Sequence, residues 1–117
     1  MSRVNNPELI NTIRILRRKA KSGPPFWKAI ADELDKSKRK RISVNVSLIN
    51  RLSKEGDIVA VPGKVLGTGN LEHPVTVAAF SFSSTARRKI EEAKGRIMRL
   101  KDLPEMDEEI SAIKILK

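Results

Sequence analysis

The sequence has no cysteine, one histidine and no tyrosine, and its aromatic side chains are three phenylalanines and one tryptophan. Without thiols the chain can form neither a disulfide scaffold nor a cysteine-built zinc site, and a single imidazole excludes a histidine-based metal site or proton relay. No apolar run approaches the roughly 20 residues of a membrane span, and Met1–Val4 leads into polar Asn5 and Asn6 rather than into an apolar signal segment. We therefore expect a protein of a soluble, reducing compartment, the cytoplasm.

Acidic residues are also scarce, and they are unevenly placed. The 117 residues include 24 Lys and Arg but 14 Asp and Glu, which gives a net charge of +10. Residues 1–54 hold 14 basic and 4 acidic side chains, whereas residues 55–117 hold 10 of each, so the whole surplus belongs to the first part. Such a one-sided positive field predicts a polyanionic partner, above all nucleic acid. The alternative is a surface that only keeps the protein soluble, for which a net charge of about 2–8 suffices.

The first part of the chain predicts two amphipathic helices. Asn6 and the proline after it are a typical helix start, and apolar residues recur at helical spacing over residues 7–20. Glycine and proline in the segment 22–25 end this helix and begin the second one. Phe26 and Trp27 fall on the apolar side of the second helix, where we expect core packing, although rings of this kind can also stack on bases.

The second part of the chain changes to strand signals separated by turns. Residues 57–61 predict a buried strand that Pro62 and Gly63 stop, and the run 75–82 predicts another, because β-branched and aromatic residues dominate it. The other predicted elements are strands at 42–46, 97–98 and 113–116, short helices at 47–56 and 83–95, an extended segment at 64–66 and a turn at 102–106.

A glycine cluster between two of these strands invites comparison with phosphate-binding loops. A Walker loop needs Lys and then Ser or Thr after its last glycine, whereas here Lys64 follows the first glycine, Gly63, and no hydroxyl residue comes next. Gly67-Thr68-Gly69 also lacks the helix-opening third glycine of the dinucleotide fingerprint. We interpret these glycines as tight turns; in a second reading, their exposed amides beside Lys64 pack against a nucleic-acid backbone. No grouping of acids, hydroxyls and the histidine suggests catalysis.

The strongest chemical signal is a set of basic side chains in the first part. Phosphate neutralisation requires long cationic side chains without strict spacing, and five cations fall within residues 36–41, a run that cannot be buried. The pattern indicates polyanion binding but does not distinguish RNA from DNA, so a DNA-binding or chromatin-type protein is the alternative. The set consists of Arg14, Arg17, Arg18, Lys19, Lys21, Lys36, Lys38, Arg39, Lys40, Arg41 and Arg51.

Two stretches of the second part carry a family likeness. They are Val61-Pro62-Gly63-Lys64-Val65-Leu66-Gly67-Thr68-Gly69 and His73-Pro74-Val75-Thr76-Val77-Ala78-Ala79-Phe80-Ser81-Phe82-Ser83. Both closely resemble the eighteen-e protein family of the archaeal and eukaryotic large ribosomal subunit, which is similar to the bacterial large-subunit protein fifteen. The likeness extends upstream through the basic run, and the short chain resembles the archaeal type.

The resemblance implies a structural, non-enzymatic constituent of the large ribosomal subunit that needs no cofactor or metal. Its implied partners are large-subunit ribosomal RNA and neighbouring ribosomal proteins. Its implied fold is a small single α/β domain of irregular strand–strand–helix units with helical basic N-terminal elements. Within it, residues 1–54 are expected to be the basic RNA-binding part and residues 55–117 the charge-balanced core part.

The resemblance also suggests which residues contact RNA. It supports the basic set above and adds Asn45, Lys64, Arg87 and Arg88. The segment 103–106, Leu-Pro-Glu-Met, departs from the family pattern, so the docking of residues 100–117 is not predicted.

Overall fold

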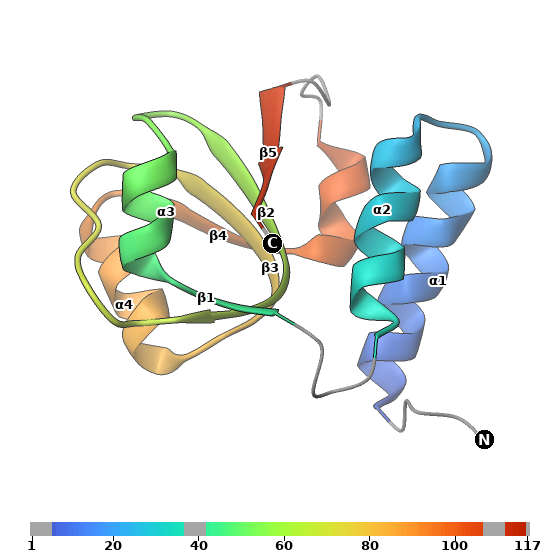
Figure 1. The fold of residues 1–117 in the computed structure, drawn as a ribbon, viewed down its shortest axis with the longest axis horizontal. Coiled ribbons are helices and arrows are strands. Elements are labelled where there is room, and N and C mark those ends of the chain that lie inside the picture. The colour runs from blue at the N-terminus through green and yellow to red at the C-terminus, as the bar shows by residue number, and fades with distance from the viewer. Residues whose placement is uncertain (1–5, 37–41, 107–111, 117) are drawn as a thin grey trace.

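A parallel β-sheet with helices on both faces forms the framework of the protein (Figure 1). The structure is a computed structural model that describes residues 6–36, 42–106 and 112–116. Its helices are α1 (Pro7–Lys21), α2 (Pro25–Leu34), α3 (Val46–Leu52), α4 (Ser84–Glu92) and the 3₁₀ helix η1 (Leu100–Glu105). Its strands are β1 (Ile42–Asn45), β2 (Ile58–Leu66), β3 (Thr76–Phe82), β4 (Arg96–Arg99) and β5 (Ile113–Ile115). The predicted α/β class is confirmed.

The strands pair in the order β1-β2-β3-β4, with β5 also on β2, and every pairing is parallel. β3 pairs with both halves of β2, whereas β5 pairs with residues 58–60 and β1 with residues 63–66. β5 and β1 therefore share the edge of β2 that lies opposite β3, one along each half. Because the carboxyl ends of parallel strands meet at one edge of a sheet, Asn45, Leu66 and Phe82 end their strands on the same side.

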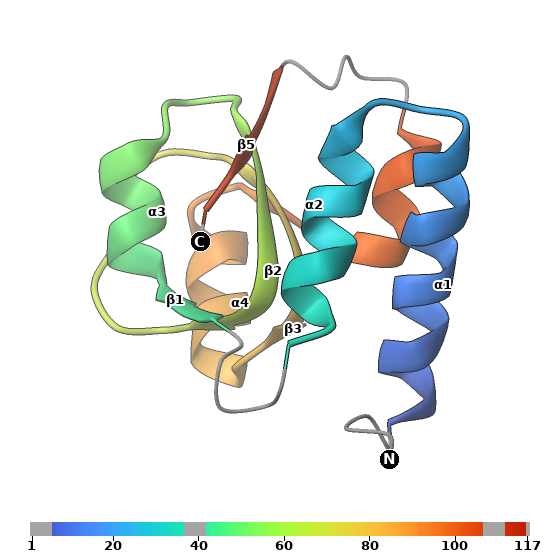
Figure 2. The same ribbon diagram turned by 45° about the vertical axis from the view of Figure 1, so that its right-hand side comes forward.

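Side chains that alternate along the strands build two separate cores. Ile58 and Ala60 of β2 face α1, α2 and η1, and Trp27 is buried in the same cluster. Val59 of β2 faces the other way, toward α3 and α4, where it packs in a cluster with Ile90. Figure 2 shows the sheet between these two layers of helices. Burial on both faces explains why β2 is apolar at nearly every position.

α1 begins where the sequence predicts. Asn6 Oδ1 accepts hydrogen bonds from the backbone N–H groups of Glu8 (2.9 Å) and Leu9 (3.4 Å), and Pro7 occupies the first turn. Leu9 and Ile13 are buried, so the apolar stripe of the helix faces the core and its basic residues face outward.

α2 carries both rings that the sequence places on its apolar side. Trp27 is 2% exposed, and the half-buried Phe26 meets it edge-on with ring centroids 4.9 Å apart. The prediction of core packing is therefore confirmed, and the Trp27 ring is not accessible to a base.

The loop 67–75 connects two parallel neighbouring strands without a helix. It leaves β2 at the carboxyl edge of the sheet and returns to the start of β3 along α3. The backbone N–H of Ser47 donates to the Thr68 carbonyl (3.2 Å). Farther along, the Asn50 side chain donates to the Glu72 carboxylate (3.0 Å) and accepts from the Glu72 N–H (2.9 Å). These bonds fix the loop to α3 over most of its length.

The prediction that Pro62 and Gly63 stop a strand is wrong. β2 continues through both residues to Leu66, and its register with β3 shifts between Val61 and Lys64. A β-bulge of this kind accommodates a proline, which has no N–H to donate to the neighbouring strand. The predicted extended segment 64–66 is thus the second half of the same strand.

Smaller corrections concern other boundaries. Val46, predicted as the end of a strand, is the first residue of α3, and Asn45 rather than Ser47 is the residue that precedes this helix. The predicted turn at 102–106 is largely the 3₁₀ helix η1, which buries Leu100 and Leu103 against the α1 side of the sheet. The predicted strands at 97–98 and 113–116 are confirmed as β4 and β5.

Candidate nucleic-acid interface

The outward side of α1 carries a shallow basic groove. Arg14, Arg18 and Lys21 are spaced by four and three residues, which places their side chains along one stripe of a helix. Lys19 is also exposed, but it does not line the groove. The groove has a volume of about 510 Å³ and is lined by Ile10, Ile13, Arg14, Arg17, Arg18 and Lys21.

Arg17 differs from its neighbours because it already has protein partners. Its guanidinium donates to Asp35 on the residue after α2 (2.9 Å) and to Asp32 on α2 (3.4 Å). The hydrogen bond to Asp35 is the main reason that the pKa of Arg17 lies above its ordinary value. The pKa of Asp32 is lowered, chiefly by the hydrogen bond that Lys28 donates to it (2.7 Å). Arg17 therefore joins α1 to α2, and the cations of the groove without an ion pair among the described residues are Arg14, Arg18 and Lys21.

The predicted basic run is only partly within the described residues. Lys36 forms an ion pair with Glu33, with its Nζ 2.9 Å from both carboxylate oxygens. Lys38, Arg39, Lys40 and Arg41 lie outside the described residues.

Three further predicted contacts come from β1, α3 and β2. Arg51 and Lys64 are exposed, and Lys64 lies between Ser43 of β1 and Ser81 of β3 in the register of the sheet. Asn45 has an internal role, because its Oδ1 accepts a hydrogen bond from the Thr68 N–H (3.3 Å). The structure thus gives Asn45 a function in holding the loop 67–75.

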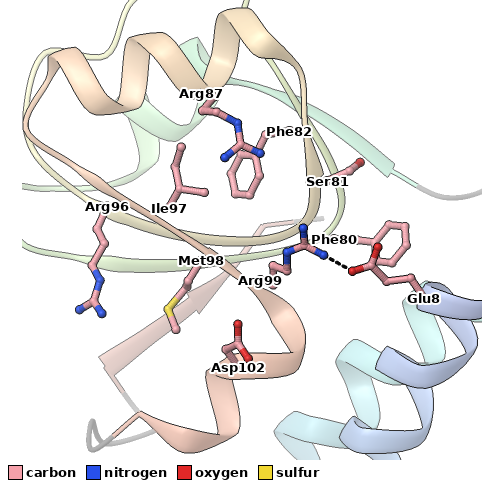
Figure 3. A pocket seen from close by; sticks show the side chains of 10 residues that line it. All are labelled: Glu8, Phe80, Ser81, Phe82, Arg87, Arg96, Ile97, Met98, Arg99 and Asp102. Atoms are coloured by element: carbon pink, nitrogen blue, oxygen red, sulfur yellow. Dashed lines mark hydrogen bonds and ion pairs between the residues drawn. The ribbon is translucent and has the colours of Figure 1, made fainter.

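A second groove, of about 530 Å³, lies where β3 extends past the end of β4 (Figure 3). The Arg87 guanidinium lies 5.8 Å from the centroid of the Phe82 ring, within the range of a cation–π contact. Arg99 forms an ion pair with Glu8, which ties the edge of the sheet to the start of α1 (Figure 3). The groove mixes both charges with apolar side chains; its lining is Glu8, Phe80, Ser81, Phe82, Arg87, Arg96, Ile97, Met98, Arg99 and Asp102.

The two basic residues predicted on α4 have different surroundings. Arg87 lines the second groove, whereas Arg88 points to Glu92 one turn along the helix (3.3 Å). Arg96 and Arg99, which also line this groove, were not predicted. The available signal was an arginine at each end of the short predicted strand 97–98, since an edge strand exposes its terminal side chains.

Lys89 is a further residue that sequence reasoning missed. Its Nζ donates hydrogen bonds to the carbonyl oxygens of Gly67 (2.6 Å) and Gly69 (2.5 Å). Gly69 has a positive φ of +91°, as expected for a tight turn. The turn interpretation is therefore confirmed for this part of the glycine cluster, whereas Gly63 lies inside β2.

The single histidine has a neighbour with a fixed role. The His73 Nε2 lies 3.0 Å from Ser53 Oγ, and the Ser53 hydroxyl donates to the Ile49 carbonyl (2.5 Å). Ser53 thus gives its proton to the backbone and accepts from the imidazole. Among residues 6–36, 42–106 and 112–116, no three His, Asp or Glu side chains are grouped so that they could hold a metal ion, and no helix has the length and apolarity needed to cross a membrane.

Comparison with known proteins places this fold among ribosomal proteins. Residues 26–98 match the model of a family described as the ribosomal proteins 50S-L15 and 50S-L18e together with their 60S counterpart. The chain belongs to this family, and the identification made from the two glycine-containing stretches is confirmed.

Individual archaeal relatives match over most of their length. The chain is 50% identical over 113 residues to large ribosomal subunit protein eL18 of Methanothermobacter thermautotrophicus, with 96% of this chain and 93% of the relative covered. It is 44% identical to the eL18 protein of Sulfurisphaera tokodaii (84% and 83% covered) and 46% identical to that of Methanococcus maripaludis (83% and 79% covered). As a member of this family the chain is a structural ribosomal protein and not an enzyme.

Proposed function

We propose that the protein is a constituent of the large ribosomal subunit in the cytoplasm, where it binds large-subunit ribosomal RNA and meets neighbouring ribosomal proteins. The names of its relatives, all large ribosomal subunit proteins, support this assignment. The RNA is bound by the basic surface of residues 1–54, with the α1 groove at its centre and the run 36–41 beside it in the sequence.

The observation that carries the proposal is the state of the cations on α1. Arg17, Lys28 and Lys36 are paired with acids of α2 or of the residues that follow it, whereas the stripe of Arg14, Arg18 and Lys21 has no acidic partner among the described residues. Unpaired guanidinium and ammonium groups on one stripe of a rigid helix are suited to phosphates, which arginine binds through two parallel hydrogen bonds.

The mechanism is electrostatic. RNA segments that fold against one another bring phosphates close together, and cations held between them lower the repulsion. The buried sheet and its two cores keep α1 in place, so the cations are presented from a fixed position rather than from a mobile tail.

The test removes the stripe. In the variant Arg14→Gln/Arg18→Gln/Lys21→Gln, the slope of log K against log salt concentration for in vitro transcribed large-subunit ribosomal RNA should decrease in magnitude by about 2–3, because each lost phosphate contact removes about 0.7–0.9. Thermal unfolding should stay close to that of the unmodified protein, since these side chains are exposed.

A second triple variant serves as the matched control. Lys28→Gln/Lys94→Gln/Lys101→Gln removes the same charge outside the groove and should change the slope by less than about 1. Equal slopes for the two triple variants would show that only total charge matters and would overturn the assignment to α1. Binding that survives ribonuclease treatment of co-purified material would indicate a DNA-binding protein instead.

A further inference from the structure

The glycine loop, defined here as residues Gly67–Asn70, is packed so closely that its backbone touches two helices directly. A Cβ atom on Gly67 would lie 2.5 Å from Thr85 Cγ2 and 2.9 Å from the backbone N of Ala86, at the start of α4. A Cβ on Gly69 would overlap the Ser47 side chain of α3, and the φ of Gly69 is positive. The loop thus lies where the starts of α3 and α4 meet at the carboxyl edge of the sheet.

Three successive carbonyl groups of this loop are held from the protein side. Lys89 Nζ donates to the carbonyls of Gly67 (2.6 Å) and Gly69 (2.5 Å), and the Ser47 N–H donates to the carbonyl of Thr68 (3.2 Å). The Thr68 N–H is also used, because it donates to Asn45 Oδ1 (3.3 Å).

The direction of the carbonyls fixes the direction of the next amides. In a trans peptide the C=O and the following N–H point in opposite directions, and the described residues contain no cis peptide. The Thr68 carbonyl points to α3 and the Gly69 carbonyl points to Lys89, so the N–H groups of Gly69 and Asn70 point away from the two helices. Asn70 is exposed, and neither N–H donates to another described residue.

The charge behind the loop is positive and not cancelled. Lys89 is half-buried, and its described partners are two neutral carbonyls rather than a carboxylate. The acid nearest to the loop in sequence, Glu72, accepts hydrogen bonds from Asn50 on α3. Backbone N–H groups that point outward with a cation behind them favour a bound anion.

We infer that the glycine loop is a preformed binding site for a phosphate group of the RNA backbone, and that Lys89 is the residue that positions it. This inference rests on the proposed RNA partner. Lys89 acts through the loop and does not reach the phosphate itself, so the site reads the backbone of the RNA and not its bases.

The first experiment reads the amides of the unmodified protein. Titration with inorganic phosphate at constant ionic strength should shift the ¹⁵N–¹H signals of Gly69 and Asn70, with chloride as the control anion and the amides of Gly56 and Gly95 as internal references. Equal shifts with chloride, or no shift at the loop, would overturn the inference without any dependence on variants.

The second experiment separates shape from charge. Gly69→Ala removes no charge, so it should weaken binding to large-subunit ribosomal RNA about fivefold or more while leaving the salt slope unchanged. Lys89→Met should weaken binding to a similar extent, whereas Lys94→Met, which removes the same charge just after α4, should stay within about twofold. Circular dichroism and thermal unfolding verify that each variant is folded.

The outcomes distinguish this site from the general function. Unchanged affinity in folded Gly69→Ala or Lys89→Met protein would overturn the loop site while the α1 surface still binds RNA. Absence of any salt-dependent RNA binding by the unmodified protein would instead overturn the proposed function on which the site depends.

Discussion

Close backbone packing decides what individual residues can be. At Gly63, a Cβ would overlap the carbonyl oxygen of Ile42 on the neighbouring strand β1. The bulge that admits Pro62 brings the two backbones together at this point, so the position excludes every side chain. Gly56 shows the other use of glycine: its φ is +85°, but a Cβ there would meet no atom within 4 Å.

This difference gives a prediction for stability. Gly63→Ala should lower the free energy of unfolding by about 1–3 kcal/mol or more, because β1 must move away from β2. Gly56→Asn should cost less than about 1 kcal/mol, since asparagine tolerates positive φ and the space is open. Urea denaturation measures both values, and a Gly63→Ala protein as stable as the unmodified one would show that β1 adjusts without cost.

Contacts between elements distant in sequence hold the sheet together. Asp57, just before β2, accepts a hydrogen bond from the Lys54 N–H (2.8 Å) and pairs with Lys114 of β5 (2.9 Å). The Lys114 partner is the main reason that the pKa of Asp57 lies below its ordinary value, followed by the Lys54 bond. The pair therefore fastens β5 to the turn that precedes β2.

The sign of this shift predicts how stability depends on pH. A carboxyl whose pKa is lower in the folded protein stabilises the fold above its unfolded pKa of about 3.9, and this contribution is lost as the pH falls through the folded value. Asp57→Asn should therefore reduce the urea midpoint at pH 7 and have little effect near pH 2. Lys114→Met should produce the same pH-dependent loss. A difference between Asp57→Asn and the unmodified protein that stays constant from pH 7 to pH 2 would contradict the assignment.

Most elements could be predicted from the sequence because their signals are local. Asn6 and the proline after it mark the start of α1, and β-branched residues mark β3. Signals that depend on the neighbouring strand were misread: Pro62 ends an isolated strand, but a bulge against β3 keeps it inside β2. The sequence also shows no reason why β5 should pair with β2 rather than with another strand, because pairing order is a property of the assembled sheet.

The candidate interface could be predicted in outline for a similar reason. Exposure of the α1 cations follows from helical spacing alone. That Arg17 is taken up by Asp32 and Asp35 could not be predicted, because the two acids are 15 and 18 residues away and belong to α2 or the position after it. Lys89 was missed because its partners are backbone carbonyls, which no side-chain pattern reveals.

At the scale of the whole molecule, the boundary in charge is not a boundary in structure. β1 and α3 belong to the basic part by sequence, but β1 pairs with β2 and α3 packs in the same core as α4. The division at residue 54 therefore stays a prediction about RNA contact, while the fold itself joins both parts.

The net charge predicts the response of the intact protein to salt. If six to ten phosphates are engaged, affinity for ribosomal RNA should fall by about 10³–10⁵ between 50 and 200 mM salt. Filter binding or fluorescence anisotropy over this range gives the slope. A slope near zero would mean that the positive charges of residues 1–54 do not neutralise phosphates.

The shared edge of β2 has a consequence for the order of folding. Residues 58–60 find their outer neighbour in β5, which follows every other described element in the chain. A chain that has emerged only as far as β4 can form the rest of the sheet, but it leaves an open row of peptide groups beside β2, and such rows recruit strands from other molecules. The interval before β5 arrives is thus the period in which a growing chain is most prone to self-association.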